Sequence, residues 1–122
     1  MNEWIALRKL LDGLESDTNY GSLDPLAQRV LEWVYVRSKS NDPLFVQEII
    51  TDSRIASPAT LHKCIASLKE QGLLDLSIDP SDARRRVVAI TSLSDRVMAD
   101  LSKGVRDWAG SFAPNERKSG KV

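Results

Sequence analysis

Apolar residues recur with helical spacing along most of the chain and alternate with polar residues in one segment. Steps of three and four residues predict amphipathic helices over 2–15, 24–37, 47–52, 58–71 and 92–112. Between the last two helices the spacing changes to alternation, which predicts two strands. The sequence therefore predicts a mainly α protein with a small β-hairpin.

Local signals mark where these helices begin and end. Asp24-Pro25 and Ser57-Pro58 each place a capping side chain before a proline, an arrangement that favours a helix start. Gly72 ends the fourth helix, because glycine readily adopts the left-handed conformation that follows many helices. These signals agree with the apolar periodicity, so the helix limits have two independent supports.

The hairpin follows directly after the fourth helix. Its strands are predicted over 73–78 and 86–90, and the residues between them are typical of turns. Residues 44–46 are a candidate short strand beside the hairpin. Either Thr91 or Ser92 caps the last helix.

The order helix, turn, helix, hairpin over residues 24–91 is that of a winged helix-turn-helix. We expect one domain over residues 1–112, with terminal helices at 1–15 and 92–112 on either side of this winged unit. Residues 113–122 have no apolar periodicity and are predicted to be disordered.

The net charge is zero, with 17 basic and 17 acidic residues, but the charges are unevenly distributed. Residues 1–56 hold 6 Lys/Arg and 9 Asp/Glu, a balance of −3, whereas residues 57–122 hold 11 and 8, a balance of +3. The zero net charge is evidence against a non-specific nucleic-acid coat protein. The basic excess coincides with the fourth helix and the hairpin, where a basic face would bind nucleic acid.

Several classes of protein receive no support from the sequence. One cysteine allows no internal disulfide and is compatible with a reducing cytoplasm. No apolar run is long enough to span a membrane, and the N-terminal residues do not form a secretory signal. His62 and Cys64 point to different faces of one helix, so neither a nucleophile pair nor a metal site is expected. We therefore expect no enzymatic activity, metal or cofactor.

The fourth helix is the candidate DNA-reading element. Four apolar residues, Leu61, Cys64, Ile65 and Leu68, share one face, and Cys64 is expected to be buried there and unreactive. The opposite face carries small or hydrogen-bonding groups, which allow close approach to base edges. The alternative is an ordinary amphipathic helix with a small solvent face, but the hairpin that follows favours insertion into a groove. The expected DNA-binding residues of this helix are Ser57, Pro58, Ala59, Thr60, His62 and Lys63.

The hairpin tip carries three consecutive arginines, which cannot all be buried without partners. We expect Asp82 and Arg84 to pair and shape the wing. Arg84, Arg85 and Arg86 are the candidate contacts to phosphate or minor groove, with Arg85 and Arg86 supplying the positive charge. A solvated basic turn is the alternative.

The terminal helices carry apolar stripes that a short chain cannot easily cover. Packing in the core of one chain is one interpretation of the tryptophans. Pairing with a second copy is the other, and we favour it because soluble monomers avoid large apolar patches. The expected homodimer interface comprises Trp4, Leu7, Leu11, Val97, Leu101, Val105, Trp108 and Phe112.

These features resemble the MarR-type winged helix regulators. The stretch SPATLHKCIASLKEQGLL is similar to that family's recognition helix, and DPSDARRRVVAIT is similar to its wing, with Asp82, Arg84 and Thr91 at the marked positions. The resemblance covers about residues 24–112. It implies a mostly helical dimer, a terminal-helix interface and binding to operator DNA.

The chain departs from the family pattern in three places. The turn TDSRIASP is one residue longer than usual, and Ala83 replaces an arginine often found in the wing. Short terminal helices predict that the pocket for phenolic effectors is small or missing, so a small-molecule effector remains an open question. The function predicted overall is that of a bacterial, cytoplasmic, DNA-binding transcriptional repressor, and the alternative is a winged-helix protein-interaction module without DNA binding.

Overall fold

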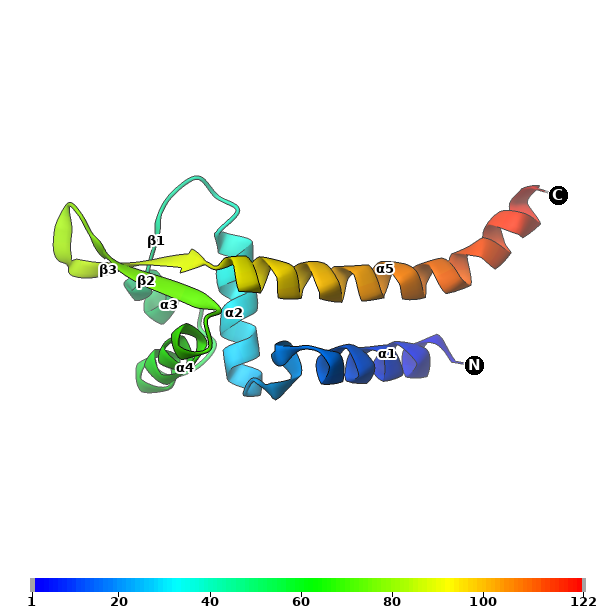
Figure 1. Ribbon diagram of the computed structural model, residues 1–122, viewed down its shortest axis with the longest axis horizontal. Coiled ribbons are helices and arrows are strands. Elements are labelled where there is room, and N and C mark those ends of the chain that lie inside the picture. Colours follow the sequence, from blue (N-terminus) through cyan, green and yellow to red (C-terminus); the bar gives the residue numbers. More distant parts are fainter. Residues whose placement is uncertain (1, 122) are drawn as a thin grey trace. The chain divides into compact units, whose positions relative to one another are not determined.

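The structure is a computed structural model that describes residues 2–121, with side chains for residues 2–111. It contains five α-helices, one 3₁₀-helix and three strands within these residues (Figure 1). Two compact units are distinguished, residues 23–95 and residues 1–22 with 96–122.

Helix α2 (Pro25–Arg37) forms the base of the 23–95 unit. Asp24 caps it, since the Asp24 carboxylate accepts a 2.9 Å hydrogen bond from the backbone N–H of Leu26. Pro25 begins the helix, where a missing N–H leaves no hydrogen bond unmade. The buried stripe of α2 consists of Ala27, Val30, Leu31 and Val34, the spacing that the sequence predicts.

Strand β1 (Leu44–Phe45) leads directly into α3 (Val46–Asp52). The Glu48 carboxylate accepts a hydrogen bond from the backbone N–H of Phe45 and forms a 2.9 Å ion pair with Arg37. The backbone N–H that precedes α3 thus finds its hydrogen-bond acceptor in a side chain of the same helix. This pairing also ties α3 to the end of α2.

Helix α4 (Pro58–Glu70) packs against α2 and α3 through its apolar face. Leu61 and Leu68 are fully buried, and Cys64 and Ile65 are nearly so. Gly72 follows with φ of 76°, the left-handed conformation predicted from its position. The apolar face predicted from the sequence is the one that packs.

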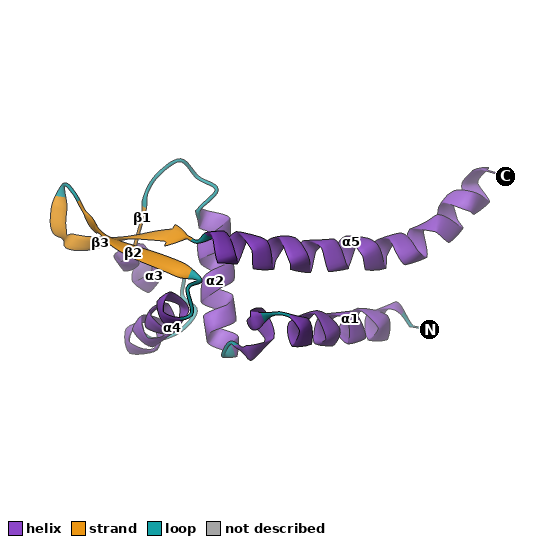
Figure 2. Ribbon diagram, in the orientation of Figure 1, coloured by secondary structure: helices purple, strands orange, loops and turns teal. Residues whose placement is uncertain are grey.

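Strands β2 (Leu74–Asp79) and β3 (Asp82–Ile90) form the hairpin, and the sheet order is β1-β3-β2, all antiparallel (Figure 2). The second strand begins four residues earlier than the sequence predicts, because Asp82 pairs with Asp79 beyond a register irregularity that follows the Ile78–Arg86 pair. Ile78 lies opposite Arg86 and is 57% exposed. The hairpin therefore exposes Ile78 and Arg86 in its outer half, whereas Asp79 at the end of β2 is only 7% exposed.

Helix α5 (Ser92–Lys121) begins where the sheet ends. The Thr91 hydroxyl accepts a hydrogen bond from the backbone N–H of Ser94 and donates one to the Gly72 carbonyl. The Ser94 hydroxyl donates to the Leu73 carbonyl. Of the two candidate caps, Thr91 is thus the one used, and these contacts tie the first turn of α5 to the end of α4.

The other unit contains α1 (Glu3–Asp17), η1 (Asn19–Ser22) and α5 beyond Asp95. A Cβ atom on Gly104 would clash with the Leu14 side chain, so α1 and α5 pack closely at this position. The structure extends α5 to Lys121, past the predicted limit at Phe112. The side chains of residues 112–121 and all of Val122 lie outside the described residues, and the predicted disorder of 113–122 stays a prediction.

Among the described residues, none of the helices has the length and apolar character needed to cross a membrane.

Candidate nucleic-acid interface

The exposed face of α4 carries small and polar side chains at its N-terminal end. Ala59, His62 and Lys63 are exposed, and Thr60 is half-buried. The Ser57 hydroxyl accepts a 3.4 Å hydrogen bond from the backbone N–H of Thr60 and donates to the Thr60 hydroxyl. Ser57 therefore caps the helix. His62 and Lys63 are the polar groups at this end of α4 that are most accessible to a ligand.

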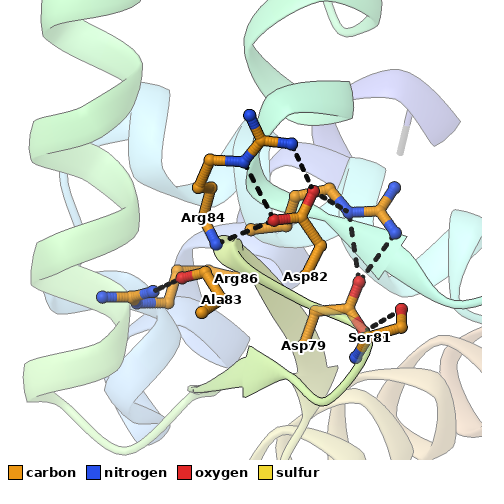
Figure 3. A network of polar contacts seen from close by, with 7 residues as sticks. Asp79, Ser81, Asp82, Ala83, Arg84 and Arg86 are labelled. Atoms are coloured by element: carbon orange, nitrogen blue, oxygen red, sulfur yellow. Dashed lines mark hydrogen bonds and ion pairs between the residues drawn. The ribbon is translucent and has the colours of Figure 1, made fainter.

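Asp82 and Arg84 form a closed pair at the hairpin tip (Figure 3). One Asp82 carboxylate oxygen accepts hydrogen bonds from the backbone N–H and Nε of Arg84, at 3.0 and 3.1 Å. The other accepts from Nη2 of the same guanidinium at 3.2 Å. This is the pairing that the sequence favours for holding the loop. The Arg84 side chain nevertheless remains 90% exposed, so its outer edge can still meet a polyanion.

Arg85 is held more tightly than the sequence suggests. Its guanidinium donates two hydrogen bonds to Oδ2 of Asp79, at 2.7 and 3.1 Å, and lies 4.1 Å from the ring centroid of Phe45. Asp79 is nearly buried, with 7% exposure. The expected role of Arg85 as a free charge is therefore reduced, because a buried carboxylate largely neutralises it.

Arg86 lies on the opposite face of β3 from Arg85, since side chains alternate along a strand. Its only hydrogen bond among the described residues is a 3.5 Å contact to the Ala83 carbonyl. Arg86 lines a hollow of about 620 Å³ between α4 and the hairpin, together with His62 and Lys69. Figure 3 shows Arg86 pointing away from the pair of aspartates. It is the wing cation with the least internal compensation.

Lys69 is a residue that the sequence analysis missed. It is exposed and lines the same hollow as His62 and Ala66. Lys69 lies seven residues after His62 and three residues after Ala66, which puts it on the same helix face. The sequence predicts that these residues share a helix face. It does not predict the hollow, which forms only because β3 lies beside α4. Glu70 also lines the hollow and lowers its positive potential.

The hairpin carboxylates are held in their charged form. The pKa of Asp79 lies below its ordinary value, first because the backbone N–H of Ser81 binds the carboxylate and also because Arg85 does. The pKa of Asp82 is lowered chiefly by the hydrogen bond from the Arg84 side chain. Both aspartates thus remain anionic at neutral pH and keep their arginines fixed.

Cys64 is placed for packing. Burial raises the pKa of its thiol, and the Asp24 carboxylate adds to the rise. A raised pKa keeps the thiol protonated and unreactive. Within the described residues, no group of three or more His, Cys, Asp and Glu side chains is gathered in a way that could hold a metal ion.

The predicted dimer residues fall into three groups by exposure. Trp4 and Val105 are 64% and 41% exposed, and Val97 is already buried within the single chain. Four others are half-buried: Leu7, Leu11, Leu101 and Trp108. The Phe112 side chain lies outside the described residues. Ile5, which the sequence analysis did not name, is 47% exposed and adds to the apolar surface of α1.

A helix-turn-helix followed by an antiparallel hairpin defines a winged helix protein. No protein-family model matches the chain. Among curated proteins it is similar to the transcriptional regulator HosA of Escherichia coli O111:H-, with 26% identity over 68 residues. These residues are 56% of this chain and 50% of that regulator, so the match spans half the length of the relative.

Solved structures match over nearly the whole chain. A mutant of MepR from S. aureus bound to an oligodeoxyribonucleotide has a TM-score of 0.72 at 12% identity, covering 96% of this chain and 87% of that chain. The transcriptional regulator Tm0710 from Thermotoga maritima has a TM-score of 0.68 at 18% identity, with coverages of 95% and 82%. These similarities confirm that the chain has the fold of the MarR-type winged helix regulators that its sequence resembles.

Proposed function

We propose that this protein is a sequence-specific DNA-binding transcriptional regulator. In this proposal α4 lies in the major groove, and the β2–β3 hairpin contacts phosphate or the adjacent minor groove. The observation that carries the proposal is the shared hollow of His62, Lys69 and Arg86, which joins the exposed face of α4 to the wing. Lys69 of α4 and Arg86 of the hairpin place cations on both sides of this hollow, where they could bind the phosphates of one DNA strand.

The relatives support this function. HosA is described as a transcriptional regulator, and the MepR mutant is bound to an oligodeoxyribonucleotide. Regulators of this kind are not enzymes, and we propose no catalytic role for this chain. We further propose that it acts in the cytoplasm as a repressor and as a homodimer through its terminal helices. A two-fold dimer would present two α4 helices to a palindromic site.

The function is tested by selecting a preferred duplex from a random pool and titrating it at several salt concentrations. For a DNA-binding protein, the logarithm of the binding constant falls linearly with the logarithm of salt concentration. We expect His62→Ala and Lys63→Ala to weaken binding to the selected duplex by about tenfold, because a good base contact contributes about 1–3 kcal/mol. Binding to random duplex should change less. Equal losses on both duplexes would show that these residues do not read bases.

The alternative is a winged-helix module that binds another protein. The zero net charge and the internal pairing of Arg84 and Arg85 favour it. The same titration separates the two functions, because a protein-interaction module would give neither a selected duplex nor a steep salt dependence.

A further inference from the structure

The turn between α3 and α4 contains a residue in an uncommon backbone conformation. Arg54 has φ of 55°, and among the described residues it is the non-glycine residue with positive φ. A side chain with a Cβ atom makes this left-handed region costly, so glycine or asparagine usually occupies it. Strain of this kind is a reason to look for a function of the side chain.

The turn adopts this backbone conformation, but none of its contacts calls for an arginine side chain. The neighbours on both sides, Ser53 and Ile55, are half-buried and line one hollow with Trp33 of α2. Arg54 itself is exposed and makes no hydrogen bond or ion pair with another described residue. Glycine would follow the same path without strain. The arginine therefore strains the turn, and no contact of its side chain with another described residue offsets that strain.

The position of Arg54 is suited to DNA. It precedes the α4 cap Ser57 by three residues, which span at most about 10 Å. The major groove is about 12 Å wide, so a helix that enters it brings the preceding turn to the phosphates at the edge of the groove. Arginine suits such a site, because its planar fork can donate two hydrogen bonds to one phosphate.

We propose that Arg54 binds a backbone phosphate at the edge of the groove that α4 enters. This inference rests on the DNA-binding function proposed above. It assigns to the turn a cation that contributes affinity without reading sequence. A contact of this kind fixes how deeply and at which register α4 lies on the duplex.

The test uses the full chain and the selected duplex, with Arg54→Gly as the main variant. This substitution removes the charge and relieves the strain, so stability and DNA binding should change in opposite directions. We expect a higher denaturant midpoint, about tenfold weaker binding to selected and random duplexes alike, and a salt slope shallower by about 0.9. Arg54→Lys should keep much of the affinity. Lys9→Gln, which removes an exposed cation of α1, is the matched control and should leave binding unchanged.

The outcomes separate the two proposals. If the wild-type chain binds DNA and Arg54→Gly binds it with the same affinity and salt slope, the Arg54 assignment is wrong. The proposed DNA-binding function is unaffected by that result. A lower denaturant midpoint in Arg54→Gly would show a structural role and would also overturn it. Absence of salt-dependent duplex binding by the wild-type chain would overturn both.

Discussion

Nη2 of Arg85 lies 2.7 Å from Oδ2 of Asp79, across the turn of the hairpin. The same guanidinium lies over the ring of Phe45, which belongs to β1. Arg85 therefore connects all three strands of the sheet at the point where the hairpin leaves the core. The three arginines of the wing consequently have different partners, although they are adjacent in sequence.

Arg85 and Arg86 should be separable by mutation. Arg86→Ala should weaken binding to every duplex and make the salt slope shallower by about 0.9, because one phosphate contact is lost. Arg85→Ala should change the slope less, since Asp79 already compensates its charge, and should lower the thermal midpoint instead. Titrations at several salt concentrations, with thermal melts of both variants, check this. An equal change of slope in the two variants would contradict the internal role of Arg85.

The Asp79 network should make stability depend on pH in acid. Because the folded-state pKa of Asp79 is lowered, its contribution is fully present above the unfolded value, near 3.8, and is lost as pH falls through the folded pKa. We expect Asp79→Asn to be less stable than wild type at pH 7 and the difference to shrink below pH 3.8.

Denaturant unfolding at a series of pH values measures this difference. Asp75→Asn is the matched control, since Asp75 is exposed on the same strand. It should change stability little at any pH. A difference between wild type and Asp79→Asn that persists unchanged at the acid end would exclude the carboxylate as its source.

The proposed dimer has a direct test at Val105. This residue is 41% exposed on α5, and a carboxylate there would be buried without a partner if two copies meet. Val105→Asp should shift the chain from dimer to monomer in sedimentation equilibrium. Val36→Asp, at a 73% exposed valine of α2, is the control and should leave the dimer intact. Identical masses for wild type and Val105→Asp would remove α5 from the interface.

Gly72 should be intolerant of substitution. Its φ of 76° is left-handed, so Gly72→Ala should destabilise the chain by about 1 kcal/mol or more. Gly13→Ala should have the opposite sign, with a gain of about 1 kcal/mol, because Gly13 lies within α1 and a Cβ there would meet nothing within 4 Å. Free energies of unfolding from denaturant titration compare the two. Destabilisation of similar size in both variants would exclude the backbone explanation.

Sequence patterns alone determined the elements of this protein. Asp24-Pro25, Ser57-Pro58 and Gly72 mark helix ends through contacts within a few residues, and these local contacts form wherever the chain has the same order. The buried face of α4 was predictable for the same reason, since helical periodicity depends only on spacing.

Tertiary structure decided which of these residues are free to act. Asp79 and Phe45 neutralise and cover Arg85 only because β3 lies between β1 and β2, and Lys69 joins His62 and Arg86 only because the hairpin lies beside α4. The neighbours of Arg54 in the chain line a hollow with residues of α2, which local spacing does not reveal. Local spacing determines on which face of a helix or strand a side chain lies. Whether its charge is compensated depends on residues that folding brings close from elsewhere in the chain.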